Sequence, residues 1–395
     1  MSRPLSILTA TTLFPNAVQR AHGVFVETRL RHLVASGEVT AHVLAPIPWL
    51  PPLVRYGAYG ALQSVPSQVE RNGLVVEHPR YLVVPKFGMT LTPRTLYRAM
   101  RKRLVALLKA GHRFDLVDAH YFYPDGVAAV RLAREFNLPV TVTARGTDLS
   151  LIPQFPGPRK MILDAAANAS AMITVCQALK DTLVEMGVAP DRVTVLRNGV
   201  DLELFRPVDR QAARKALGLT RRTLASVGLL IDRKGHHHII RTLKQLPETD
   251  LLIAGDGPDR RALERLAQEE GVSDRVRFLG SVDQNRLREI YNAVDALVLA
   301  SSREGWANVL LEAMACGTPV VASAVWGTPE VVARPEAGVL MPSLDPQGVA
   351  AGVTSLFAAY PDHAATRRYA EGFNWDATTQ GQLTLFRAIL ANAGV

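Results

Sequence analysis

Short apolar runs alternate with helical patterns along almost the whole chain, and this alternation restricts the fold more than any other feature. In the first half, the apolar runs are followed by stretches with helical spacing, as at 25–33, 126–135 and 160–169. Strands that alternate with helices favour a parallel α/β sheet. The strands expected in this half are 5–9, 39–44, 115–119, 139–143, 171–175 and 193–196.

The same alternation begins again after a polar stretch that starts at Arg206-Pro207. Because a domain usually holds about 100–200 residues, a chain of 395 residues is expected to form two. We expect Rossmann-like domains at 1–205 and 206–375, with a helix at about 376–395 packing back on the first. Ligands bind at the carboxyl ends of the strands in such sheets, so we expect a central cleft. The strands expected in the second half are 224–227, 250–254, 276–279, 296–299 and 319–322.

The positive charge is concentrated in the first half. Residues 1–205 hold 23 Lys and Arg against 15 Asp and Glu, whereas the remaining residues hold 22 against 21. This asymmetry indicates an anionic partner for the first domain, such as an anionic membrane or a phosphate-bearing acceptor. A basic face that only keeps the protein in solution is an equally favoured alternative. No nucleic-acid-binding motif accompanies the charge, so we expect no nucleic acid partner.

The N-terminus and the hydropathy of the chain favour a cytoplasmic protein that can associate with the inner face of the membrane. The apolar run after Arg3 is short and lacks a small-x-small cleavage site before Pro15, so a first strand is favoured over a signal peptide. No run approaches the length of a transmembrane helix. The two cysteines, Cys176 and Cys316, form no disulfide framework or metal-site spacing.

A proline-rich stretch, 46–68, fits no strand or helix. Loops of this length are usually functional or disordered. The aromatic residues Trp49, Tyr56 and Tyr59 are candidates for contact with a lipid-linked acceptor or a membrane. Packing on the parent domain is the favoured alternative.

The segment from Ser301 to Pro319 carries the strongest functional signal. It predicts a buried strand, a loop and a helix that begins near Asn308. Glu304 then follows the carboxyl end of a strand, and Glu312 lies on the same helical face as Asn308. Free amides at a helix start bind anions, and carboxylates accept hydrogen bonds from sugar hydroxyls. The candidate donor contacts here are Glu304, Gly305, Trp306, Ala307, Asn308, Val309 and Glu312.

This segment resembles the signature of the family 4 glycosyltransferases, which are retaining enzymes of the GT-B fold. In that family, the first glutamate of the signature binds the transferred sugar and the second binds the nucleotide ribose. Glu304 and Glu312 occupy these positions, and Trp306 stands where an aromatic residue, usually phenylalanine, is common. The resemblance implies two doubly wound Rossmann-like domains, with the donor site in the second.

Residues 227–235 resemble the phosphate loop of the same family. Lys234 takes the place of the lysine that binds the donor phosphates. The family's arginine after the first glycine is Leu229 here, and the adjacent Arg233 is the candidate that supplies its charge. Two cations would neutralise the departing diphosphate, so no metal or other cofactor is expected. The run 236–238 of histidines is not expected to bind metal, because consecutive helical residues do not share a face.

Segments of the first half also resemble the family. Gly23 is expected to let the backbone approach the diphosphate. His120 ends a strand and matches the family's histidine at the reaction centre, which contacts the transferred sugar. The resemblance therefore makes His120 and Glu304 the candidate catalytic residues. Arg145 and Asp148 lie in a second cleft loop, where Arg145 replaces the usual histidine. That replacement suggests an acidic donor sugar or acceptor.

The resemblance implies that a sugar is transferred with retained configuration from a nucleotide-diphosphate sugar, with UDP favoured over GDP. The implied acceptor is a glycan or a lipid-linked molecule of bacterial cell-surface polysaccharide assembly, including teichuronic-acid types. Two alternatives are a nucleotide-sugar epimerase and a non-catalytic nucleotide-sugar-binding protein. The signature ending at Glu312 speaks against the first, and the presence of Glu304, Lys234 and His120 speaks against the second.

Overall fold

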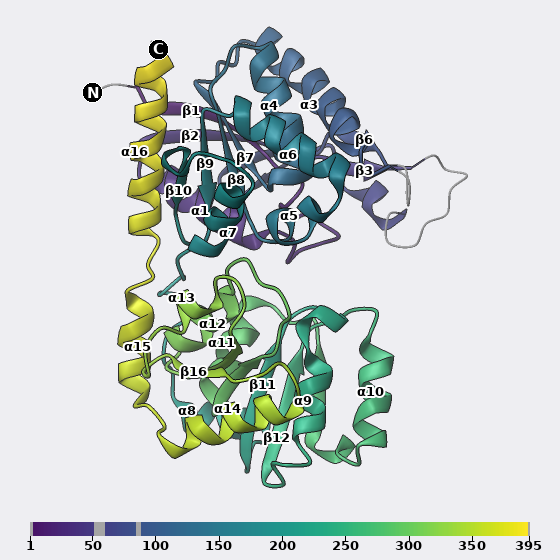
Figure 1. Cartoon of the computed structure of the whole chain (residues 1–395), viewed down its shortest axis with the longest axis vertical. Helices are drawn as coiled ribbons and strands as arrows, with labels where there is room; N and C mark the ends of the chain where they lie inside the picture. The colour runs from purple at the N-terminus through teal and green to yellow at the C-terminus, as the bar shows by residue number, and fades with distance from the viewer. Residues whose placement is uncertain (1–2, 51–59, 84–87, 394–395) are drawn as a thin grey trace. The chain divides into compact units, whose positions relative to one another are not determined.

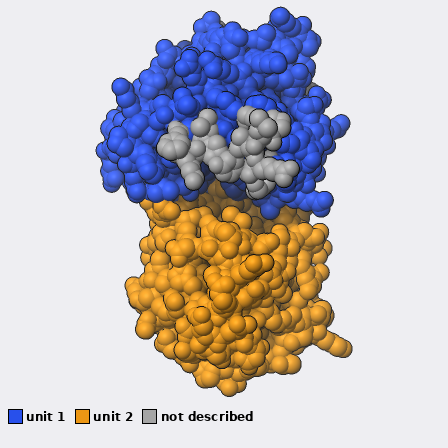
Figure 2. Space-filling model, turned by 90° about the vertical axis from the view of Figure 1, so that its right-hand side faces the viewer, with its two compact units in different colours: residues 1–197, 376–395 blue, residues 198–375 orange. Residues whose placement is uncertain are grey.

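The computed structural model describes residues 3–50, 60–83 and 88–393. The chain divides into two compact units, the first made of residues 1–197 together with 376–395 and the second of residues 198–375, coloured separately in Figure 2. The division therefore falls slightly before the expected boundary at 205. Within the described ranges, no helix is long and apolar enough to cross a membrane.

The first unit contains an eight-stranded sheet with the order β10-β9-β8-β7-β1-β2-β5-β4. All neighbouring strands are parallel except β4 and β5, which form an antiparallel pair. Central parallel strands are buried on both faces, which explains why the sequence shows them as continuous apolar runs. The strands are β1 (Leu5–Ala10), β2 (Val39–Leu44), β4 (Gln68–Arg71), β5 (Leu74–Glu77), β7 (Leu116–His120), β8 (Val140–Ala144), β9 (Ala171–Thr174) and β10 (Val193–Val195).

Helices on the two faces of this sheet make it doubly wound. From β1 the chain runs through α1 to β2, whereas from β7 it runs through α4 to β8 in the opposite direction along the sheet (Figure 1). Right-handed crossovers in opposite directions place α1 and α4 on opposite faces. The helices of this unit are α1 (Val24–Ala35), α3 (Thr92–Lys109), α4 (Val127–Glu135), α5 (Thr147–Ser150), α6 (Pro156–Asn168), α7 (Gln177–Glu185) and α16 (Asp376–Ala393).

The helix α16 belongs to the first unit although it follows the second unit in the sequence (Figure 1). Its Leu383 and Phe386 are completely buried in the same apolar cluster as Ile7 of β1 and Val26 of α1. Burying a side chain of this kind contributes about 1.5–3 kcal/mol. This helix is therefore an integral part of the core of the first unit.

The second unit contains a six-stranded parallel sheet with the order β13-β12-β11-β14-β15-β16. Its strands are β11 (Arg222–Val227), β12 (Thr249–Ala254), β13 (Val276–Gly280), β14 (Ala296–Leu299), β15 (Val320–Ser323) and β16 (Gly338–Met341). Its helices are α8 (Arg210–Leu217), α9 (His236–Thr242), α10 (Arg260–Glu269), α11 (Gln284–Ala293), α12 (Asn308–Ala315), α13 (Thr328–Val331), α14 (Pro346–Ala358) and α15 (His363–Glu371).

The predicted fold class, two doubly wound Rossmann-like domains, is confirmed. Every strand expected from the sequence is present within two residues of its expected ends. The expectation that 46–68 holds no element is wrong, because this stretch contains β3 (Ile47–Trp49), a 3-10 helix (Leu62–Ser64) and the first residue of β4. β3 pairs with β6 (Arg80–Leu82) in a separate two-stranded sheet. Trp49 is 39% exposed, whereas Tyr56 and Tyr59 lie outside the described residues.

Candidate active site

The loop after β14 is joined to the predicted phosphate loop by an ion pair. Nζ of Lys234 lies 2.6 Å from Oε1 of Glu304, and the two side chains are 16% and 9% exposed. The backbones of the two loops also pack closely together, since a Cβ atom on Gly235 would lie 1.8 Å from the carbonyl oxygen of Ala300. Gly235 has φ 68°, a conformation that glycine adopts without strain. The structure thus brings together the two residues that the sequence assigned to phosphate and sugar.

Arg233 is held by the same loop, because its Nη1 donates to the carbonyl oxygen of Arg303 at 2.7 Å. The amide of Ser302 donates back to the carbonyl oxygen of Arg233 at 2.9 Å. Leu229, where the family has arginine, is 61% exposed and so faces solvent. The Arg233 guanidinium, next to Lys234 in the sequence, is therefore oriented by a backbone carbonyl group, and no acidic side chain in the described part of the chain pairs with it.

Glu312 lies on α12, which begins at Asn308 as predicted. Oε2 of Glu312 accepts a hydrogen bond from the hydroxyl of Tyr291 at 3.0 Å. Burial raises the pKa of Glu312 to about 7, with the Tyr291 hydrogen bond acting in the opposite direction. At neutral pH this carboxyl group is therefore poised between its acid and its anion, and either form can bond to a hydroxyl group.

The start of α12 offers fewer free amides than the sequence implied. The amide of Asn308 donates to the carbonyl oxygen of Trp306 at 3.1 Å, and that of Leu310 donates to Ala307 at 3.0 Å. Trp306 and Ala307 are buried, and the Trp306 ring packs at 6.1 Å from the ring of Phe373. Their side chains thus support the loop, whereas Gly305 and Val309 are partly exposed.

In the first unit, His120 is held on both sides of its ring. Its Nε2 lies 3.1 Å from Oδ2 of Asp118, and its Nδ1 lies 2.5 Å from Nη2 of Arg145. Burial lowers the pKa of His120 to about 4, and Arg145 lowers it further while Asp118 opposes the shift. The ring is therefore neutral, with Nε2 donating to Asp118 and Nδ1 accepting from Arg145. His120 is 1% exposed and Arg145 is 8% exposed, so both side chains are buried in this structure.

Asp148 and Gly23 have structural tasks that the sequence did not reveal. Asp148 is fully buried, and its oxygens accept backbone hydrogen bonds from Phe122 at 2.7 Å, Gly146 at 2.7 Å and Arg145 at 3.1 Å. It fixes the loop that carries Arg145 and presents no surface to a ligand. Gly23 has φ 71°, and a Cβ there would lie 2.2 Å from the carbonyl carbon of Leu13. Close packing of two backbone segments thus requires the glycine.

Sequence reasoning missed the residues behind His120. Gln382 of α16 is 1% exposed, and its Nε2 donates to Oδ2 of Asp118 at 3.0 Å. Its Oε1 accepts from Nε of Arg29 at 2.9 Å, and burial lowers the pKa of Arg29 to about 10. A single glutamine from a distant part of the chain thus joins α1 to β7. No sequence pattern marks such a residue, because the separation from Asp118 along the chain is 264 residues.

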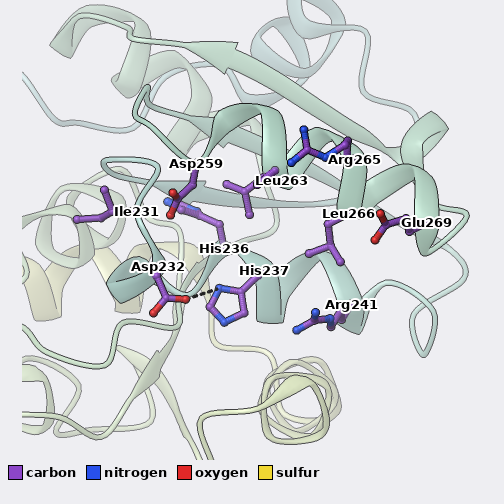
Figure 3. Close-up of a pocket in the computed structure, with 11 residues that line it drawn as sticks. Ile231, Asp232, His236, His237, Arg241, Asp259, Leu263, Arg265, Leu266 and Glu269 are labelled. Carbon is purple, nitrogen blue, oxygen red and sulfur yellow. Dashed lines mark ion pairs between the residues drawn. The ribbon is translucent and has the colours of Figure 1, made fainter. Parts of the chain in front are cut away.

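A pocket of about 320 Å³ opens beside the phosphate loop, but it contains neither Lys234 nor Glu304. It lies between the start of α9 and α10, with Asp232 and His237 on one side and Arg265 and Glu269 on the other (Figure 3). Its charges are mixed, so it favours no particular ligand. Among the described residues, no three His, Cys, Asp or Glu side chains gather closely enough to hold a metal ion.

Comparisons with known proteins agree on one family. The model "Glycosyltransferase Family 4" matches residues 23–204, and the model "Glycosyl transferases group 1" matches residues 208–373. A D-inositol 3-phosphate glycosyltransferase from Frankia alni is 32% identical over 73% of this chain and 78% of its own length. The chain belongs to the family 4 glycosyltransferases. Another relative of the same name, from Catenulispora acidiphila, is 29% identical over 92% of this glycosyltransferase and 90% of its own length.

Other relatives are matched over less of their length. The alignment with the Mycobacterium marinum protein of the same name, at 35% identity, covers 51% of this glycosyltransferase and 46% of the relative. Solved structures share the fold. Sucrose-phosphate synthase from Thermosynechococcus elongatus has a TM-score of 0.82 at 24% identity, covering 99% of this glycosyltransferase and 100% of that chain. Anabaena HepE in complex with UDP and glucose has a TM-score of 0.74 at 19% identity, covering 98% and 100%.

Proposed function

We propose that this protein transfers a sugar from a nucleotide-diphosphate sugar to a glycan, lipid-linked or phosphorylated acceptor, with retention of the anomeric configuration. The observation that carries the proposal is the 2.6 Å pair of Lys234 and Glu304 close to the start of α12. A nucleotide sugar presents a diphosphate beside sugar hydroxyls, which suit a cation beside a carboxylate. Structures of similar fold solved with UDP or UDP-glucose support this donor class.

In this proposal the second unit binds the donor. Lys234 and Arg233 neutralise the charge that develops on the diphosphate as the glycosidic bond breaks. Glu304 orients the transferred sugar, and Glu312 holds the ribose. The departing phosphate oxygen takes the proton of the acceptor hydroxyl, whose oxygen forms the new bond on the same face of the sugar. The proposal needs no metal ion.

The first unit binds the acceptor in this proposal, and Arg145 is the candidate for its recognition. The relatives are named for a phosphorylated acceptor, inositol 3-phosphate, and the sequence favoured acceptors of cell-surface polysaccharide assembly. The guanidinium of Arg145, which lies beside His120, would suit a phosphate or carboxylate on the acceptor or the sugar. Arg145→Ala is expected to reduce kcat/KM more for charged substrates than for neutral ones. Equal losses on both would remove Arg145 from this role.

A thermal-shift screen with UDP-, GDP- and ADP-sugars tests the donor. A ligand at 100 times its Kd stabilises the protein by about 2.7 kcal/mol, and we expect the largest shift with a UDP-sugar. No shift with any nucleotide sugar or nucleotide diphosphate would refute the proposal. Incubation with the donor alone separates transfer from epimerisation, because only an epimerase converts the free donor. Release of nucleotide diphosphate that depends on an acceptor distinguishes the enzyme from a non-catalytic binding protein.

We also propose peripheral contact with an anionic membrane at the inner face, as the charge of the first half suggested. Transfer to a lipid-linked acceptor would benefit from such a contact, since it confines enzyme and acceptor to one surface.

A further inference from the structure

Five large apolar side chains of the first unit remain unusually exposed at one corner of it. Trp49 ends β3 and Leu82 ends β6, and these two residues are register partners in the parallel β3–β6 pair. Partners in parallel strands point to the same face. The five are Trp49, Leu82, Met89, Leu91 and Phe155, each between 39% and 48% exposed.

Contacts between the segments that carry these side chains place the segments next to one another. Oγ1 of Thr95 donates to the carbonyl oxygen of Leu82 at 2.8 Å, which ties β6 to the first turns of α3. Figure 1 shows β3 and β6 beside this helix. A Cβ on Gly157 would lie 3.0 Å from Cγ2 of Thr90, so the segment that includes Phe155 lies against the turn before α3.

Exposed cations border this apolar group. Arg94, Arg98 and Lys102 lie at four-residue spacing along the solvent side of α3, a helix that contains no acidic residue. Arg159 and Lys160 follow Phe155 and are also exposed.

The acids near α3 are already occupied by other cations. Glu77 pairs with Arg103, and Glu135 accepts from Arg101 at 2.7 Å. Neither carboxylate therefore offsets the charge of the exposed row on α3.

We propose that the docking surface, meaning the five apolar side chains and the three cations of α3, binds an anionic lipid membrane. Aromatic and aliphatic groups enter the headgroup boundary, while long cationic side chains reach anionic headgroups. This inference deepens the membrane contact in the proposed function, and its test uses no sugar transfer, so either can fail without the other.

Sedimentation of the full chain with vesicles tests the proposal. We expect binding to vesicles of phosphatidylcholine mixed with phosphatidylglycerol, weak binding to pure phosphatidylcholine, and loss of binding as salt rises. The variant Arg94→Gln/Arg98→Gln should bind roughly 25-fold more weakly, at about fivefold per charge. Its control, Lys215→Gln/Arg261→Gln, removes the same net charge from exposed helical positions of the second unit and should bind like the wild type.

The apolar part needs its own variant. The variant Trp49→Ser/Leu91→Ser should bind vesicles about tenfold more weakly. Its control, Val184→Ser/Val208→Ser, replaces two exposed valines outside the docking surface and should bind vesicles like the wild type. Unchanged melting temperatures show that the variants fold. The proposal is overturned if the wild type binds no anionic vesicle, if the control pairs lose as much binding as the docking-surface pairs, or if both docking-surface pairs bind normally.

Discussion

At the scale of single residues, substitutions in the Lys234–Glu304 pair should separate UDP binding from sugar transfer. Glu304→Gln removes the partner that neutralises Lys234, so the lysine becomes fully available to phosphates. We expect this variant to bind UDP as tightly as the wild type or more tightly, while kcat falls by about 10²-fold or more. Calorimetric titration with UDP and a transfer assay measure the two effects. Lys234→Ala is the matched case, in which UDP binding should weaken as well. Weaker UDP binding by Glu304→Gln would contradict the assigned roles.

A second prediction concerns the protonation of His120. Its pKa is lowered to about 4 by burial, so nitrogen NMR shifts should report a neutral ring, protonated at Nε2, from neutral pH down to about pH 5. An unfolded histidine takes up its proton near pH 6.5. Between these values the unfolded chain binds more protons, so this residue lowers stability as pH falls through the window, by about 1.4 kcal/mol per pH unit. If the ring of His120 titrated near pH 6.5, it could not be buried with both nitrogens hydrogen-bonded.

At the scale of elements, α16 supplies the residue that holds the His120 network together. Gln382→Leu leaves Asp118 and Arg29 each short of one buried partner. Urea denaturation should show a loss of about 1–3 kcal/mol. Gln380→Leu, on the exposed side of the same helix, is the control and should be close to neutral. Equal effects of the two substitutions would show that the buried bridge contributes nothing.

The sequence predicted a strand or helix correctly where its hydrophobic pattern matches its burial in the structure. The buried parallel strands were found because burial on both faces leaves continuous apolar runs. The hairpin β4–β5 was missed although Asn72 and Gly73 form its turn, with φ values of 49° and 76°. Asn-Gly is a strong hairpin signal. However, both strands are only four residues long, and β4, at the edge of the sheet, contains one apolar residue, Val69. Lys234 and Glu304 were candidates through motif resemblance, although their ion pair was not predicted, whereas Gln382 lies in no motif.

At the scale of the whole molecule, the two units differ in how they are assembled from the chain. Residues 198–375 form a contiguous unit, whereas the first unit needs two separated segments. A fragment of 198–375 should therefore unfold cooperatively and bind UDP, because it holds Lys234, Glu304 and Glu312. The fragment 1–197 should fail to fold, because the partners of Leu383 and Phe386 would be exposed. Circular dichroism melting curves of the two fragments decide this. A stable fragment of 1–197 would show that α16 is dispensable.

The position of α16 also has a consequence for synthesis. Domains usually fold as they leave the ribosome, with the N-terminal one first. Here the N-terminal sheet emerges early but waits for a helix translated after the entire second unit. The second unit can therefore complete its folding before the unit that precedes it in the sequence. Until α16 is translated, the apolar residues of β1 and α1 that it covers stay exposed, and a ribosome that stalls before residue 376 leaves a chain in which they are never covered.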